Sequence, residues 1–497
     1  MDIPTKPVGR SLILSLMAAA IGSTAIHAKA QGGNVPIADF PVHSIVVDGP
    51  SPLGAAETAR LLAPFIGEHV TPSRLREAAT VLETSLREQG HFYLARLPEQ
   101  DLTDGVAHIL LQPVLLGHLS SSAPDKLSDD RLKTLLPTVR EGESPDLRAL
   151  ARNLAVVNEN PSRHLDLTVS AGSAPDRVDI AAKPEIAPRP WSVALGINNE
   201  GAPDPSRWRV QTVLQHADLF ERGHIGTVSY TLAPGSISDI HQYGGFYTLP
   251  FFEQGATLSG YVYHSASRTG MVDDLITISG SGDFAGLSFK QRLLSLGRWQ
   301  TAVFASMDDR YFNNRSAFFD ISAAAPVRSR PLSLGATTGW ESGTSRANTG
   351  FTWVQNLQGG SSNTPEAYAI SRADASTHWH TLRLNGDGSR FLESGAVLFA
   401  HASAQVGNQA LIPGEQFGIG GSDSLRALDP RQFAGDKGWS MSGEIWSPEF
   451  GQGFRLTGFI DAGRVYRSPA TPDELPGGID GGAGIRYSPR RAVTLTA

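Results

Sequence analysis

Two charged residues near the C-terminal end of the sequence have types and settings that suggest chemistry. Arg426 lies in the Gly-rich segment 420–428, and Asp461 lies in segment 458–463, which alternates polar and apolar residues. A guanidinium and a carboxylate can form a two-pronged ion pair. Taken alone, such residues are more often solvated surface charges. In this setting they predict a contact between a loop and a wall of strands.

Catalytic chemistry is not indicated. The sequence contains no G-x-S-x-G, no H-E-x-x-H and no P-loop lysine motif. His378 and His380 lie on one face of a predicted strand and could bind a metal, but we interpret them as lumen or surface side chains. We expect no catalytic residue, no cofactor and no metal.

The N-terminus has the features of a secretory signal peptide. Lys6 and Arg10 precede the apolar run 12–21, and the A-x-A site at 28–30 predicts cleavage before Gln31. The run is too short for a membrane-spanning helix, which needs about 20 residues. We therefore assign 1–30 to the signal peptide and 31–39 to a short linker.

The composition restricts the possible partners and the sources of stability. The chain has 497 residues, a formal net charge of -7 and no cysteine, and its pI is near 6.1. Because the chain has no excess of positive charge, nucleic acid is not an expected partner. Without disulfides, an exported chain must be stabilised by burial or by a membrane.

Residues 40–183 combine the periodicities of strands and helices, in the order β-α-α-β-β, twice. We predict one small α/β domain at 40–117 and a second at 118–183. In the first, strands are expected at 42–47, 91–96 and 106–116, and helices at 54–66 and 72–87. In the second, helices are expected at 128–136 and 146–158, and strands at 165–170 and 178–183.

A Pro-rich linker at 184–190 ends the helical part, and segments of about ten residues with period-two alternation follow from 191 to 497. A soluble sandwich or propeller is the alternative, but polar residues on one face and aliphatic residues on the other favour a transmembrane β-barrel. The fourteen expected strands start near Trp191, Arg207, His224, Asp239, Ala256, Phe284, Trp299, Leu332, Ala347, Thr377, Ser394, Trp439, Gly453 and Ile479.

Three runs of residues resemble a known family. In the first α/β domain, segment 88–105 (EQGHF…LPEQ…G) resembles the family pattern GY…LPxQ…G. In the second, segment 154–161 resembles LxxLNxxP, with Val157 in place of the second leucine. Near the C-terminus, Leu425-Arg426-Ala427-Leu428 resembles the loop tetrad [VL]-R-G-[YF]. The turn G-D-x-G (435–438), a strand with Glu444 and the strand F-x-D-x-G (459–463) follow it. The chain thus resembles the outer-membrane transporters of two-partner secretion, the hemolysin secretion/activation proteins.

The resemblance implies a mainly β fold with a 16-stranded-type barrel, preceded by two polypeptide-transport-associated (POTRA) domains in the periplasm. It implies transport of a large exoprotein with an N-terminal secretion domain, translocated unfolded to the cell surface, and possibly activation of a hemolysin or adhesin. The expected partners are that exoprotein and the lipid bilayer of the bacterial outer membrane. An assembly factor for outer-membrane proteins and a passive porin are the alternatives.

The resemblance and the alternation together predict the functional residues. Loop 409–437 is expected to fold into the lumen, where Arg426 would reach Asp461, with Glu444 nearby. The loop motif comprises Gly420, Gly421, Leu425, Ala427 and Leu428. Docking of the exoprotein is expected at Phe92, Leu97, Pro98 and Gln100, beside the helix at 74–87.

The sequence departs from the family pattern in three places. Ala427 replaces the tetrad glycine and Leu428 its aromatic residue, so the loop tip is expected to lose backbone freedom and a stacking ring. The linker 31–39 is too short for the helix that plugs the barrel in some relatives. Residues 493–497 begin a fifteenth strand where relatives continue through a sixteenth, so we expect a truncated gene product.

Overall fold

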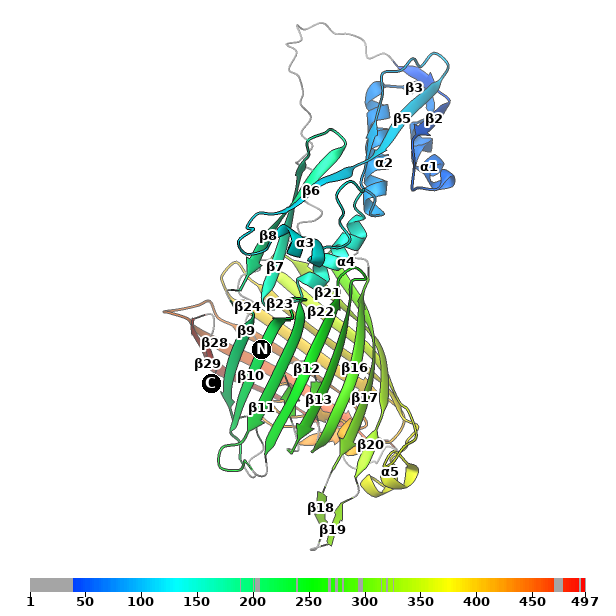
Figure 1. The fold of residues 1–497 in the computed structure, drawn as a ribbon. Coiled ribbons are helices and arrows are strands. Elements are labelled where there is room, and N and C mark those ends of the chain that lie inside the picture. Colours follow the sequence, from blue (N-terminus) through cyan, green and yellow to red (C-terminus); the bar gives the residue numbers. More distant parts are fainter. Residues whose placement is uncertain are drawn as a thin grey trace. The chain divides into compact units, whose positions relative to one another are not determined.

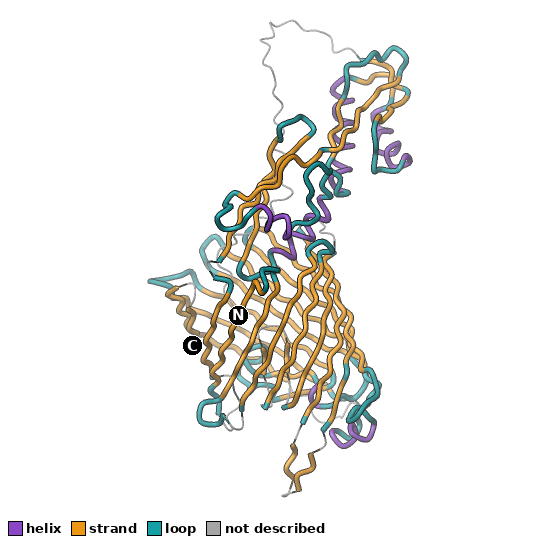
Figure 2. The backbone as a smooth tube through the Cα atoms, viewed as in Figure 1, coloured by secondary structure: helices purple, strands orange, loops and turns teal. Residues whose placement is uncertain are grey.

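The computed structural model describes residues 39–496 apart from 188, 200, 202–205, 238–239, 267–269, 273–275, 279–280, 294–297, 314, 319–320, 325, 469–476 and 491–492. The predicted signal peptide and most of the linker after it lie outside the described residues. The described chain divides mainly into an α/β unit that ends at Ala187 and a β unit that follows it. Figure 2 shows helices concentrated in the first and strands in the second.

The first α/β domain contains a three-stranded sheet, a small two-stranded sheet and two main helices. The sheet has the strand order β2-β5-β4, with β2 and β5 parallel, and β1 pairs with β3. The elements are β1 (Phe40–Val42), β2 (Ser44–Asp48), α1 (Ala55–Leu62), η1 (Ala63–Phe65), β3 (Gly67–Val70), α2 (Pro72–Glu88), β4 (Tyr93–Arg96) and β5 (Val106–Pro113).

Helix α2 shows why this segment folds as predicted. Thr71 caps its N-terminus by accepting a hydrogen bond from the Arg74 N–H, and Pro72 occupies the first turn, where its missing N–H costs nothing. Leu75, Leu82 and Leu86 recur at helical spacing and are at most 1% exposed. They form much of the core between α2 and the sheet.

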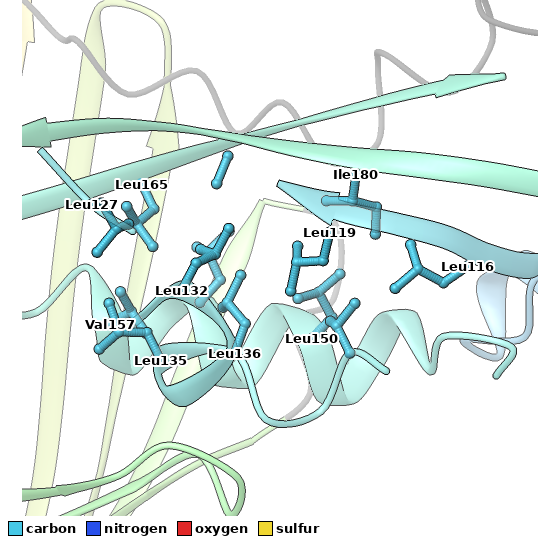
Figure 3. Packing of buried hydrophobic residues seen from close by; sticks show 13 residues of the cluster. Leu116, Leu119, Leu127, Leu132, Leu135, Leu136, Leu150, Val157, Leu165 and Ile180 are labelled. Atoms are coloured by element: carbon cyan, nitrogen blue, oxygen red, sulfur yellow. The ribbon is translucent and has the colours of Figure 1, made fainter. Parts of the chain in front are cut away.

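The second α/β domain repeats the plan with a sheet ordered β6-β8-β7. Its elements are β6 (Leu115–Ser121), α3 (Asp129–Leu135), α4 (Leu147–Val157), β7 (Arg163–Ala171) and β8 (Arg177–Ile186). Leucines of both helices pack on the sheet around Leu132, Leu135 and Leu136, which are fully buried (Figure 3). Asn158 ends α4 by exchanging two hydrogen bonds with the backbone of Leu165, which explains the asparagine of the second sequence motif.

The prediction of a single strand over 106–116 is wrong. The chain changes sheets at Val114: β5 belongs to the first sheet, whereas β6 pairs with β8 in the second. The Val114 N–H donates to the carbonyl of Phe92 and so ends the pairing with β4. Residues 115–117 therefore belong to the second domain's sheet.

Backbone contacts join the two α/β domains at the end of α2. The Arg148 guanidinium donates to the carbonyl of Glu88, at 2.6 Å from Nη2 and 3.2 Å from Nε, and the Leu147 N–H donates to the carbonyl of Gly90. Gly90 has a φ of +93°, and an ideal Cβ there would lie 2.6 Å from Arg148 Cγ. Only glycine fits this position without strain.

Glu83 on α2 gives the first domain a predicted pH dependence. Burial raises the pKa of its carboxyl from 4.5, although the hydrogen bond from Ala95 and the charges of Arg87 and Arg96 act in the opposite direction. The native state therefore holds the proton more tightly than the unfolded state, so the free energy of unfolding should fall as the pH rises above 4.5. Glu83→Gln keeps an acceptor for the Ala95 N–H and should flatten this dependence.

The measurement is thermal unfolding of the first domain, within the purified chain, from about pH 4 to about pH 7. Glu68→Gln, at an exposed position on β3, is the matched control. Parallel curves for the wild type and Glu83→Gln would contradict the prediction.

The second unit is one antiparallel sheet rolled into a barrel (Figure 1). Its path runs β9-β10-β11-β12-β13-β16-β17-β21-β22-β23-β24-β27-β28-β29-β30, and β20 pairs with β17 beside it. The strands are β9 (Trp191–Asn198), β10 (Arg209–Leu219), β11 (His224–Leu232), β12 (His241–Phe251), β13 (Ala256–Ser265), β16 (Gly282–Arg292), β17 (Trp299–Phe312), β20 (Val327–Ser329), β21 (Pro331–Ser342), β22 (Ser345–Asn356), β23 (His380–Phe391), β24 (Val397–Val406), β27 (Lys437–Trp446), β28 (Phe454–Tyr466), β29 (Gly477–Arg490) and β30 (Val493–Thr496).

All fourteen predicted strands are confirmed, with starts within three residues of the expected ones. The connections contain the hairpin strands β14 (Gly270–Val272), β15 (Ile276–Ile278), β18 (Arg315–Phe318) and β19 (Ile321–Ala324), and also α5 (Pro365–Ser371). None of the helices in the described part of the chain has both the length and the apolarity needed to cross a bilayer.

Burial alternates along the strands as the period-two pattern predicts. On β28, Leu456 and Ile460 are 53% and 61% exposed, whereas Thr457 and Asp461 are 8% and 0% exposed. The exposed set is aliphatic and the enclosed set is polar, which is the arrangement of a lipid-facing wall around a polar interior. Asp461 therefore faces the lumen.

Candidate functional site: the loop in the barrel lumen

The connection between β24 and β27, residues 407–436, forms the candidate functional site. Because neighbouring strands are antiparallel and β24 is the eleventh strand of the path, this loop lies at the opposite end of the barrel from residue 191. It contains η2 (Pro413–Glu415) and a small hairpin of β25 (Phe417–Ile419) and β26 (Phe433–Gly435). Residues 420–432, which we call the tip, connect the two hairpin strands.

The structure brings Arg426 of the tip to two acids of the barrel wall. Its Nε lies 3.4 Å from Asp461 Oδ2, and its Nη2 lies 3.0 Å from Glu444 Oε2. The Arg426 backbone N–H also donates to Asp461, at 3.3 Å. Asp461 is fully buried, while the side chains of Arg426 and Glu444 are 25% and 19% exposed.

Further contacts of the same residues hold the guanidinium in one orientation. It lies over the Phe459 ring, with 4.0 Å from Cζ to the ring centroid, and it donates to the Ser442 hydroxyl at 3.1 Å. Ser442 in turn donates to Asp461. A planar group held between a ring and two carboxylates is a site that arginine fits and lysine does not.

The loop-motif residues build the turn that presents Arg426. Gly420 and Gly421 have φ values of +118° and +91°, and a side chain at Gly420 would meet the Asp429 carbonyl at 2.1 Å. Leu425 is buried beside Ile419 and Val465, and Leu428 packs against this cluster.

Ala427 behaves differently from the sequence expectation. Its φ is outside the positive range in which the non-glycine residues Phe220, Glu221, Ser362 and Arg431 lie. The alanine therefore adopts an ordinary conformation, and its N–H donates to Asp480 at 3.1 Å. The tip does not require the φ freedom of the glycine it replaces, and Leu428 supplies apolar packing instead of a ring.

Sequence reasoning missed Glu415, an enclosed charge of the loop. Its side chain is 0% exposed and accepts hydrogen bonds from Arg310 on β17 at 3.0 Å and Arg383 on β23 at 3.1 Å. Ser329 on β20 donates to it at 2.7 Å. Alternation along β17 and β23 indicates that Arg310 and Arg383 face the lumen. No motif or spacing in the sequence relates these arginines to Glu415.

Sequence reasoning also missed the role of Asp436, which the motif indicates only as part of a turn. Its side chain is 0% exposed and accepts from Arg372 Nη2 at 3.0 Å, from the Leu411 N–H at 2.8 Å and from the Ser468 N–H at 2.7 Å. Arg372 follows α5, and Ser468 follows β28. One carboxylate therefore joins three connections at the same end of the barrel.

The predicted docking residues occupy two kinds of environment. Phe92 is 4% exposed and packs with Val114, Leu147 and Val178 between the two α/β domains, so its ring is not part of an open surface. Gln100 exchanges hydrogen bonds with the backbone of His108. Pro98 is exposed, and Leu97 is half-buried after the end of β4.

Comparison with known proteins agrees with this architecture. The family profile "Haemolysin secretion/activation protein ShlB/FhaC/HecB" matches residues 177–487. The outer membrane transporter CdiB of Escherichia coli O6:K15:H31 (strain 536 / UPEC) is 24% identical over 429 residues, which are 82% of this chain and 69% of that protein.

Two solved structures have a similar fold. CdiB from Escherichia coli has a TM-score of 0.74 at 19% identity and covers 95% of this chain and 88% of its own. CdiB from Acinetobacter baumannii has a TM-score of 0.68 at 16% identity, with coverages of 90% and 84%.

The barrel preceded by two POTRA-type domains, together with the family match, defines an outer-membrane transporter with a periplasmic part. The chain belongs to the haemolysin secretion/activation family, the outer-membrane transporters of two-partner secretion. The POTRA domains precede β9 and lie in the periplasm, so the barrel end that carries loop 407–436 faces the cell exterior.

Proposed function

We propose that this transporter receives an unfolded exoprotein at its POTRA domains and passes it through the barrel to the cell surface. Loop 407–436 would have to move out of the path of the exported chain. The observation that carries the proposal is the position of the tip. Arg426 ties it to Asp461 and Glu444 on the lumen side of two wall strands. A chain that follows the lumen has to displace these contacts.

The partner of the family is a secreted exoprotein, and we propose that it docks by adding a strand to the first POTRA domain. The order β2-β5-β4 leaves β4 at an edge of its sheet. Phe92 bonds to Val114 on the β5 side, so by alternation Tyr93 and Ala95 direct their backbone groups outward. Main-chain pairing at such an edge supplies affinity, and Leu97 and Pro98 extend the surface.

The Ala95 N–H is one of these outward groups, and an added strand would have to displace the partner that it has within the domain. It donates to Glu83 on α2 at 2.7 Å. A carboxylate there occupies the place that the carbonyl of an added strand would take. Transport would then be driven by folding of the exoprotein outside the cell, since the sequence carries no nucleotide-binding motif.

The test is secretion of an exoprotein encoded beside this chain, in cells that make either both proteins or the exoprotein alone. We expect the exoprotein in the medium only when this chain is present. A small-solute flux assay on the same cells addresses the porin alternative. Exoprotein that remains in the periplasm despite a correctly inserted barrel would overturn the proposal.

A further inference from the structure

Loop 407–436 contacts the barrel in two regions. At the tip, Arg426 pairs with Glu444 and with Asp461, whose side chain is 0% exposed. At the other region, which we call the base (residues 411–419 and 433–436), the side chains of Glu415 and Asp436 are also 0% exposed. Both regions therefore contain buried carboxylates, and they differ in what else holds them.

The base is also held by more bonds from more elements. Glu415 accepts from Arg310, Arg383 and Ser329, which come from three different strands. Asp436 joins the base to the connections that contain Arg372 and Ser468. Gln405 on β24 donates to the backbone carbonyls of both Glu415 and Asp436, at 3.1 Å each, and so connects the two anchors.

Apolar packing reinforces this difference. Leu411 and Ile412 of the base are fully buried in a cluster with Phe312, Tyr368 and Trp379. Moving the base would expose these side chains and separate two guanidiniums from their shared carboxylate in an enclosed space, where unpaired charges are costly. Moving the tip breaks the Arg426 contacts and the pairs Ala427–Asp480, Asp423–His401 and Asp429–Arg207, but it exposes only a small apolar cluster around Leu425.

The backbone offers a place to bend between the two regions. Gly420 and Gly421 lie directly after β25 with φ values of +118° and +91°, and Arg431 lies just before β26 with a φ of +50°. Hinges are commonly a few residues at the ends of elements that absorb a change of φ and ψ. The unusual conformations of the loop therefore lie at the boundary between tip and base.

We propose that Glu415 and Asp436 are positioning residues that keep the base on the barrel wall throughout transport, so that only residues 420–432 move when Arg426 leaves Asp461 and Glu444. This inference rests on the proposed function. It predicts that a covalent link between the base and the barrel wall leaves secretion unchanged, whereas a link between the tip and the wall stops secretion.

The absence of cysteine from the sequence allows this to be tested with single engineered disulfides. Leu425→Cys/Gly463→Cys tethers the tip, because an ideal Cβ at Gly463 lies 2.6 Å from Leu425 Cδ1. Gly435→Cys/Val465→Cys tethers the base, because an ideal Cβ at Gly435 lies 3.0 Å from Val465 Cβ on β28. Gly418→Cys/Ala434→Cys links directly paired residues of β25 and β26 and is the matched control, since it leaves the wall untethered.

Secretion is compared in oxidised cells and after addition of a reductant, with disulfide formation checked by gel mobility. We expect the oxidised tip tether to stop secretion and the reductant to restore it. The base tether and the control should secrete at the wild-type level in both states. Inhibition by the oxidised base tether, relieved by reduction, would overturn the inference while leaving the proposed function intact. Normal secretion by the oxidised tip tether would contradict both.

A second arm tests Glu415 itself. Glu415→Gln should reduce secretion because the base loses its charge partners, and the oxidised base tether in the same chain should restore it. A general folding defect would not respond to oxidation at this one place. Unchanged secretion by Glu415→Gln without the tether would overturn the role given to Glu415.

Discussion

Replacement of Arg426 by alanine should abolish secretion while the barrel still inserts into the outer membrane. The substitution leaves the buried carboxylate of Asp461 without its cationic partner, and breaking one side of such a pair costs about 3–5 kcal/mol. A loss of about 3 kcal/mol changes an equilibrium by about 100-fold. The tip would then sample the lumen without a defined position and obstruct the path of the exported chain. Secreted exoprotein is measured in the medium, and insertion is measured by heat-modifiable mobility.

Three further variants separate this expectation from a simple loss of charge. Arg426→Lys should secrete only in part, because an ammonium cannot contact Asp461 and Glu444 with one planar fork. Asp461→Ala should be as severe as Arg426→Ala. Arg390→Ala removes an exposed arginine of β23 and should secrete normally. Secretion at the wild-type level by both severe variants would show that Arg426 acts as a solvated loop charge.

Removal of either POTRA domain should stop export without stopping insertion of the barrel. The barrel strands pair only with one another along the path from β9 to β30 among the described residues, so they do not need the α/β sheets for their hydrogen bonds. The exoprotein, in contrast, would lose its docking edge. Deletion of residues 40–114, deletion of residues 115–183 and deletion of residues 40–183 are each compared with the wild type for secretion and for heat-modifiable mobility.

A point substitution tests the docking edge, and thermal unfolding of the same domain is measured beside secretion because the Ala95 N–H also donates to Glu83. Ala95→Pro removes the outward N–H that an added strand would use, and proline is tolerated on edge strands when that N–H does not face the neighbouring strand. We expect reduced secretion from Ala95→Pro and nearly normal secretion from Ala95→Val. The docking role would be refuted by export that survives the loss of residues 40–114.

The strands and their faces could be predicted because their signal is local. Side chains of a strand alternate between two faces, so the run from Phe454 to Tyr466 by itself indicates that Leu456 and Ile460 share the lipid side and that Asp461 faces the other way. Helix α2 was predictable for the same reason, since Thr71, Pro72 and the leucine spacing act within one segment. The break at Val114 was not, because β5 and β6 form one apolar run and only their pairing partners distinguish them.

The sequence by itself determined the classes of element, the polarity of each barrel face and the identity of Arg426 and Asp461 as candidates. Only the tertiary structure decided what holds the loop. Glu415 lies 105 positions from Arg310, and Asp436 lies 64 positions from Arg372, so no periodicity or spacing relates these residues. Rolling of the sheet brings such distant segments to one enclosed place, where a charge must find a partner because water is excluded. The physical reason is that alternation depends on the residues of one strand, whereas a buried ion pair depends on how several strands and loops are arranged around the lumen.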